Sequence, residues 1–209
     1  MNEDLTATRF FDQLAASAPG RRHLLSLAVA AEEGDEAGIF DQLAERVEGE
    51  RFRRIVERHR DDEVRHARLF RRCLARLGLA PVDLPAELRI VGQVAAEVAG
   101  ERRVRTRDDV VASYATLLAI EQRGVEQFPL IAAAFDPVDP ETAAVYRRVA
   151  RDERGHVRYC ELIGRHHAGD DAAWHRAVAG ARAAEEEAFV AVGLANLLYC
   201  TERGWVPAA

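Results

Sequence analysis

Two short segments decide the fold of this chain: Arg151-Asp152-Glu153-Arg154-Gly155-His156 and, earlier, Asp62-Glu63-Val64-Arg65-His66. Both contain the pattern Asp-Glu-x-x-His. Positions i and i+3 of an α-helix lie on the same face, so each segment directs a carboxylate and an imidazole to one side. Because both groups bind metals, two such helices predict a helical bundle with two metal ions in its core.

The helix before each motif is expected to add one inward glutamate. In the helix predicted over about residues 20–48, an inward Glu33 shares its face with a regular series of apolar residues, whereas an inward Glu32 would bring Glu36 into the core. We therefore assign Glu33, with Glu32 and Glu36 as the alternatives and Glu36 as a candidate extra ligand. In the later helix pair, the inward glutamate is Glu121.

Apolar residues at helical spacing run through most of the chain and predict an all-α fold. The expected helices cover about residues 4–16, 20–48, 50–78, 108 to Pro129, 141–167 and 171–200. Pro129 should kink or end the third long helix, and Gly180 should interrupt the last one. Residues 79–107 are too long for a hairpin connection and are expected to contain a helix around 88–98.

Composition favours one soluble, cytoplasmic domain over residues 1–209, with a bundle at 20–167 flanked by extensions at 1–18 and 168–209. The chain is 48% hydrophobic and its net charge is -6, so no basic surplus favours RNA. Its three cysteines form no Cys-x-x-Cys pair, as expected of a protein from a reducing compartment. The N-terminus does not resemble a signal peptide, and no apolar run approaches the roughly 20 residues of a membrane span.

The expected metal ligands are four glutamates and two histidines: Glu33, Glu63, His66, Glu121, Glu153 and His156. Burying four carboxylates without a cation would cost about several kcal/mol each, and a bound metal removes that cost. Carboxylate oxygens combined with imidazole nitrogens favour iron, with manganese as the alternative. Two iron ions are therefore the expected cofactor.

Other inward residues are assigned supporting roles. Asp62 and Asp152 are expected to accept a hydrogen bond from the second ring nitrogen of a ligand histidine on a neighbouring helix. His59, one turn before Glu63, is expected to be a hydrogen-bonded core histidine, and the alternative is an extra ligand. Gly124 cannot cover the metals and is expected to open a pocket. The other candidate pocket residues are Phe40, Tyr114, Phe128 and Tyr146, with core packing as the alternative for both tyrosines.

With these ligands, the chain resembles the ferritin-like di-iron carboxylate superfamily over about residues 20–167. The segment Ile120-Glu121-Gln122-Arg123-Gly124-Val125-Glu126-Gln127-Phe128 and the stretch from Tyr146 to His156 are most similar to its tRNA hydroxylase branch. Rubrerythrin-type proteins resemble the first half about as well. The resemblance implies a ferritin-like four-helix bundle with a long crossover between its second and third helices and an additional C-terminal helix.

The resemblance also implies a non-haem di-iron monooxygenase or oxidase that activates O2. Glu63 and Glu153 would bridge the metals, and each metal would have one histidine. The expected partners are O2, an unidentified substrate, a separate protein as electron donor and a second copy of the chain in a homodimer. RNA is a further candidate, because arginines gather at residues 51–60 and 102–107. The alternatives are a rubrerythrin- or ferritin-like ferroxidase or peroxidase, and a non-catalytic helical interaction protein.

Overall fold

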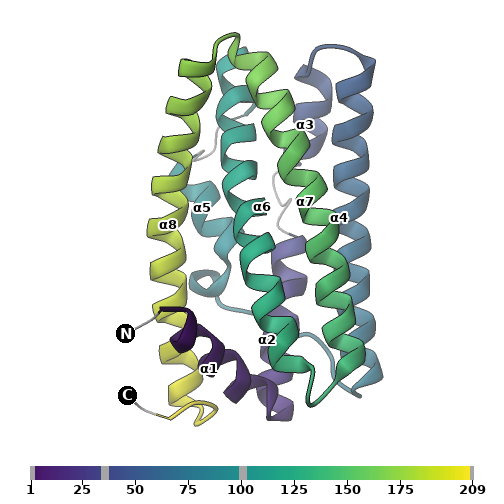
Figure 1. The fold of residues 1–209 in the computed structure, drawn as a ribbon, viewed down its shortest axis with the longest axis vertical. Coiled ribbons are helices and arrows are strands. Elements are labelled where there is room, and N and C mark those ends of the chain that lie inside the picture. The colour runs from purple at the N-terminus through teal and green to yellow at the C-terminus, as the bar shows by residue number, and fades with distance from the viewer. Residues whose placement is uncertain (1–2, 34–37, 99–102, 208–209) are drawn as a thin grey trace.

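The computed structural model describes residues 3–33, 38–98 and 103–207, and every regular element within these ranges is helical (Figure 1). The elements are α1 (Glu3–Ala15), α2 (Ala18–Glu32), α3 (Ile39–Arg46), α4 (Glu50–Arg76), η1 (Ala86–Leu88), α5 (Ile90–Val98), α6 (Arg107–Phe135), α7 (Pro140–Ala168) and α8 (Asp171–Glu202). The prediction of an all-α fold is confirmed. The helix expected around residues 88–98 is present as α5.

The long helices lie side by side and form a bundle (Figure 1). α6 and α7 form a hairpin with the most extensive interhelical packing, α4 lies along α7, and α2 packs against α4. α8 packs along α6 and against α5, while α1 crosses one end of the bundle against α2 and α6. The two Asp-Glu-x-x-His motifs therefore lie on adjacent helices, α4 and α7.

Side-chain caps explain where several helices begin. Thr106 accepts a hydrogen bond from the backbone N–H of Asp109, and the Asp109 carboxylate accepts one from Thr106 in return. Asp139 and Asp170 cap α7 and α8 by accepting a hydrogen bond from the backbone N–H three residues later. Each such cap contributes about 1 kcal/mol and satisfies a donor that the first helical turn leaves unpaired.

Two predicted helix boundaries are wrong, and so is one of the two alternatives given for Pro129. The helix expected over residues 20–48 is divided: α2 ends at Glu32 and α3 begins only at Ile39. Pro129 was expected to kink or end its helix, and it does not end it, because α6 continues to Phe135. α8 likewise continues through Gly180, because Trp174 and Ala181 are buried on either side of it.

A layer of polar side chains divides the interior into two apolar cores. One core, near α1, includes Leu25, Phe70 and Tyr146, and the other includes Val56 and Ile163. Along α4 and α7, the motif residues lie between the positions that contribute to these two cores. The carboxylates and imidazoles are therefore held in the middle of the bundle, where ionised groups are costly unless they are paired.

Candidate metal centre

Seven side chains from four helices meet in the polar layer. α2 contributes Glu32, α4 contributes His59, Glu63 and His66, α6 contributes Glu121, and α7 contributes Glu153 and His156. All except Glu63 are buried, and the Glu63 side chain is 18% exposed. Their ligand atoms form two groups, in each of which four atoms lie within 4.8 Å of one another.

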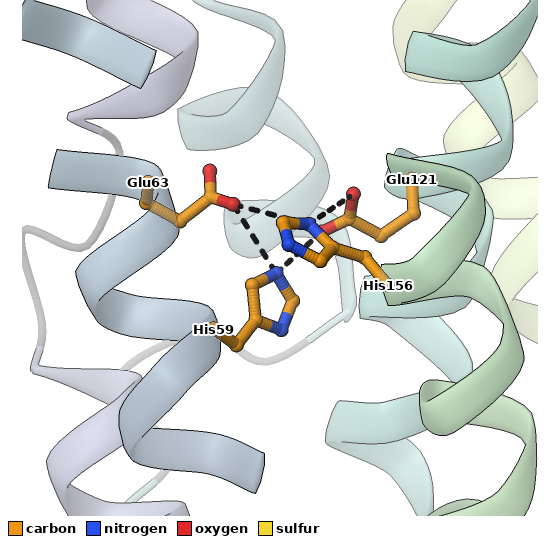
Figure 2. Close-up of side chains that lie close together, drawn as sticks. All are labelled: His59, Glu63, Glu121 and His156. Atoms are coloured by element: carbon orange, nitrogen blue, oxygen red, sulfur yellow. Dashed lines mark hydrogen bonds and ion pairs between the residues drawn. The ribbon is translucent and has the colours of Figure 1, made fainter. Parts of the chain in front are cut away.

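The first group combines two histidines with two glutamates, His59, Glu63, Glu121 and His156 (Figure 2). His59 Nε2 lies 2.8 Å from Glu121 Oε1 and 3.3 Å from Glu63 Oε1. His156 Nδ1 lies 3.3 Å from the same Glu63 oxygen and 3.4 Å from Glu121 Oε2. The four side chains converge from opposite sides on a common point, as ligands of one metal ion do.

The second group combines one histidine with three glutamates, Glu32, Glu63, His66 and Glu153. His66 Nδ1 lies 3.0 Å from Glu32 Oε2 and 3.2 Å from Glu153 Oε1. Both groups contain Glu63. Glu153 also faces both, because its second oxygen, Oε2, lies 2.6 Å from Nδ1 of His156. Two carboxylates thus lie between two adjacent sites, which suits bridging ligands.

The donor atoms fit a pair of metal ions. Glu63 Oε1, Glu153 Oε2 and His156 Nδ1 are buried and form no hydrogen bond among the described residues, although each lies close to other polar atoms of the cluster. An unsatisfied buried polar group costs about 1–3 kcal/mol. Because these atoms belong to the two groups of candidate ligands, a bound cation would satisfy them together. Oxygen donors with imidazole nitrogens suit iron or manganese.

In the metal-free protein, protons balance part of the negative charge. Burial alone would lower the pKa of His66, but hydrogen bonds to Glu153 and Glu32 and their charges outweigh it and raise the pKa to about 11. At His156, burial again acts to lower the pKa, but the carboxylates of Glu121 and Glu153, which lie close to Nδ1, outweigh burial and raise the pKa to about 10. Both imidazoles are therefore protonated near neutral pH.

The pKa values of the cluster carboxylates shift in two directions. Burial and the neighbouring carboxylate of Glu63 raise the pKa of Glu32 well above its ordinary value, and burial and Glu121 raise the pKa of Glu153. Glu121 is the exception, because the charge of His59 and hydrogen bonds to two histidines overcome burial and lower its pKa to about 2. A cation that replaces the protons would stabilise all the carboxylates in their ionised form.

Two aspartates lie beside the Nε2 atoms of the motif histidines, on the side of each ring that faces away from the cluster glutamates. Asp152 Oδ2 lies 3.3 Å from Nε2 of His66, and Asp62 Oδ2 lies 3.5 Å from Nε2 of His156. Each aspartate thus lies beside the histidine of the other motif, where the sequence analysis placed it. A ring that donates Nε2–H to an aspartate presents Nδ1 to the metal, which fixes the tautomer and the ring orientation.

Arg65 connects the two aspartates and was missed by the sequence analysis. Its Nη2 donates to Asp62 at 2.7 Å and to Asp152 at 3.1 Å. The signal was present in the motif itself, because Arg65 lies three residues after Asp62 and so shares its helix face. The corresponding position of the second motif is Gly155. One arginine therefore serves both aspartates.

Glu33 does not belong to the cluster, and this assignment is corrected. Its side chain is 42% exposed and forms an ion pair with Arg71, while the buried Glu32 holds the position expected of Glu33. The error arose because the helix face was fitted across residues 20–48, which the structure divides between α2 and α3. Within α2, Glu32 lies three, four and seven residues after buried Val29, Ala28 and Leu25. Glu36 lies outside the described residues.

The candidate pocket residues separate into two sets. Gly124 and Phe128 line a cavity of about 410 Å³ beside the cluster. Tyr114, Tyr146 and Phe40 do not line it. Tyr114 is buried in the apolar core, and the Tyr146 hydroxyl donates to the carbonyl of Leu24 at 3.3 Å. The Phe40 ring packs 4.6 Å from the His59 ring, measured between centroids, and so supports that histidine.

A further residue that the sequence analysis missed is Tyr159. Its ring centroid lies 5.2 Å from that of His59 and 5.4 Å from that of His156. Its buried hydroxyl has no hydrogen-bond partner in the described part of the chain. Burial and the charge of nearby groups, including Glu121, raise its pKa, so the phenol is neutral. It lies one turn after the second motif and gave no distinct signal in the sequence.

In the described part of the chain, the side chains of four of the nine arginines considered for RNA interact with other groups of the protein. Arg53 and Arg54 pair with Glu50, and Arg60 pairs with Asp41. Arg107 donates to the carbonyl groups of His166 and His167 near the end of α7. These interactions give the side chains structural roles, and the argument for a phosphate-binding surface is correspondingly weaker.

Comparison with family models, with curated proteins and with solved structures finds no match for this chain. Among the described residues, none of the helices has the length and apolar character needed to cross a membrane. The argument for function therefore rests on the residues themselves. They form an all-helical protein with a buried cluster of acidic and histidine side chains that could bind metal.

Proposed function

We propose that this protein is a non-haem di-iron oxidoreductase with a ferritin-like bundle, which activates O2 as a monooxygenase or oxidase. The observation that supports it most is the pair of adjacent four-residue groups that share Glu63. Glutamates from two helices and a Glu-x-x-His pair from each of two others are the ligand pattern of di-iron carboxylate proteins built on four helices. Glu32, Glu121 and the two motifs supply that pattern here.

The cluster residues can be assigned to two metal positions. Glu63 and Glu153 would bridge them, His59, Glu121 and His156 would hold one, and Glu32 and His66 would hold the other. When bound, ferrous iron supplies the electron transfer to O2 that amino-acid side chains do not offer. With an organic substrate, the balanced reaction inserts one oxygen atom into a C–H bond and reduces the second to water. It uses two protons and two electrons from a separate reductant.

The remaining residues of the chain position this centre. Asp62 and Asp152, held by Arg65, fix the Nε2 side of both motif histidines and so would keep Nδ1 directed at bound ions. Protons on His66 and His156 would leave when metal binds. The two apolar cores above and below the cluster exclude water from it, which limits unproductive reactions of reduced oxygen.

The cavity beside the cluster favours an oxygenase or oxidase over a ferroxidase. Its volume of about 410 Å³ lies within the range of about 300–1,000 Å³ typical of small-molecule sites. Glu32, Glu63, Glu121 and Glu153 all line it, so a bound molecule would lie against the carboxylate side of the centre. A ferroxidase needs access only for iron and O2 and has no use for a cavity of this size.

Anaerobic loading with ferrous iron tests the proposal. We expect two irons per chain after removal of excess metal, and O2 uptake that a reductant and a substrate sustain. Glu153→Ala should lose iron and all turnover, whereas Glu161→Ala, which removes an exposed carboxylate of the same helix, should retain both. Less than one metal per chain would overturn the proposal. O2 uptake that stops once the iron is oxidised, with every substrate tried, would support the ferroxidase alternative.

A further inference from the structure

The cavity beside the metal centre has a polar side and an apolar side. The side formed by the cluster glutamates is called its floor, and the remaining lining residues are called its walls. All four glutamates of the cluster line it, whereas none of the cluster histidines does. The walls come from α1, α2, α5, α6 and α8, and most of their side chains are apolar. Representative wall residues are Phe10, Ala28, Ile90, Phe128, Ile131 and Val192.

The polar side chains of the walls are mostly occupied by one another. Arg123 donates to both carboxylate oxygens of Glu185 at 2.9 Å and lies 3.8 Å over the ring of Phe189. The amide oxygen of Asn196 accepts a hydrogen bond from Nε2 of His23 at 2.8 Å, and its amide N–H donates to the carbonyl of Val192 at 3.0 Å. These groups are satisfied without a ligand and offer little to a polar one.

A polar substrate would therefore lose its hydrogen bonds with water on entering and regain few of them, which disfavours binding. An anionic group would also meet the carboxylates of the floor. A hydrocarbon chain has no hydrogen bonds with water to lose, and its transfer from water to an apolar site is favourable in free energy. Among the described wall residues, Gln127 is the polar side chain without a hydrogen bond, so one amide is available to orient a ligand.

We infer that the substrate of this centre is a medium-chain aliphatic compound, bound with its hydrocarbon end against the carboxylate floor and any polar end away from it. This inference rests on the proposed function and narrows it to one class of substrate. It disfavours a nucleoside, whose ring nitrogens and hydroxyl groups find few partners on these walls.

Gly124 gives access to this cavity without disturbing the ligands. A Cβ atom added there would lie 3.6 Å from Glu153 Cγ and 3.6 Å from Phe128 Cε2, which is ordinary van der Waals contact. Alanine therefore fits, and a longer side chain takes space from the cavity beside the metals. Gly180 of α8 is the matched control, because it is exposed, does not line the cavity, and has no atom within 4 Å of an added Cβ.

Calorimetric binding of 1-dodecanol, 1-decanol and adenosine to the zinc-loaded protein tests the inference without turnover. We expect saturable binding of 1-dodecanol, about tenfold weaker binding of 1-decanol because two methylenes are lost, and no binding of adenosine. Gly124→Leu should weaken 1-dodecanol binding at least tenfold, and Gly180→Leu should leave it unchanged. If circular dichroism shows that Gly124→Leu is unfolded, Gly124→Ala takes its place, with a smaller weakening expected.

Two results would overturn the inference: adenosine binding more tightly than 1-dodecanol, or binding of 1-dodecanol that is absent or insensitive to residue 124. The proposed function is tested by a different experiment, namely iron loading and O2 uptake. A chain that binds two irons and consumes O2 but not 1-dodecanol would retain the function and lose the substrate class. A chain that binds 1-dodecanol without holding two metals would have a hydrophobic site and no di-iron centre.

Discussion

Glu32 and Glu33 are adjacent, chemically identical and expected to differ completely in their effect on metal binding. The Glu32 carboxylate is buried and lies 3.0 Å from Nδ1 of His66. Glu33 points to solvent and pairs with Arg71. Glu32→Gln should therefore reduce the iron content from two to about one per chain, whereas Glu33→Gln should retain two.

The expected stability changes follow from burial. The Glu33 and Arg71 side chains are 42% and 45% exposed, so their ion pair contributes at most about 1 kcal/mol. Its loss should lower the melting temperature by no more than about 2–4 °C in a chain of this length. Burial and the charge of Glu63 raise the pKa of Glu32 because they disfavour its ionised form, and the neutral amide of Glu32→Gln has no charge to bury. Metal-free Glu32→Gln should thus melt close to the wild type.

Iron content after anaerobic loading, measured beside thermal melting of both metal-free variants, provides the assay. Iron should stabilise the wild type and Glu33→Gln by similar amounts, because a ligand that binds the folded state raises its stability. Glu32→Gln should be stabilised less. If Glu33→Gln loses an iron while Glu32→Gln binds two, the assignment of the α2 ligand is refuted.

Three further predictions concern the hydrogen-bonded support, the protons and the packing. Asp152→Asn should lower metal affinity about 10–100-fold, measured by competition with a chelator, because it weakens the support of His66. Since His66 and His156 have pKa values raised to about 11 and about 10, metal must displace their protons at neutral pH. Each displaced proton should raise the affinity about tenfold per pH unit between about pH 6 and 8. The first group should release two such protons, because the charge of Glu121 overcomes burial and raises the pKa of His59 as well. A flat profile would contradict protonated imidazoles. Gly164→Ala should lower stability by about 1–3 kcal/mol in chemical denaturation, because its methyl would overlap the tryptophan of α8. Gly180→Ala, in open space, should not destabilise the protein.

The residue types of the cluster could be predicted from the sequence because they depend on the spacing of residues within single helices. The Asp-Glu-x-x-His pattern determines which groups share a helix face, and that relation survives whatever the partner helices do. The positions of Asp62 and Asp152 followed from the same rule, since each residue before a ligand glutamate is turned toward a neighbouring helix. Glu121 could be placed because α6 is one continuous helix, so its apolar face has one phase throughout.

The wrong predictions concern positions where packing between helices, and not local sequence, determines the structure. Glu33 was chosen because the face of one helix was fitted to residues beyond its end, and Gly34 follows Glu33 at the position where glycine commonly ends a helix. Pro129 does not end α6 and Gly180 does not interrupt α8, because burial of neighbouring side chains outweighs their local cost of about 1–3 kcal/mol. The cavity itself has no sequence signature, because residues from five helices form its walls.

The two halves of the cluster are related by a sequence repeat, and their difference at one position has a chemical consequence. His59 precedes Glu63 by four residues, and the residue four before Glu153 is Val149, which is fully buried in an apolar core. The first group therefore has two imidazoles and the second has one. With Glu63 and Glu153 shared between the two ions, as proposed, each ion would have one further glutamate, from α6 or from α2, so the two positions would have equal carboxylate charge and differ by one imidazole. The repeat thus provides the site, and the departure from it at His59 makes the two metal positions inequivalent in their nitrogen ligands.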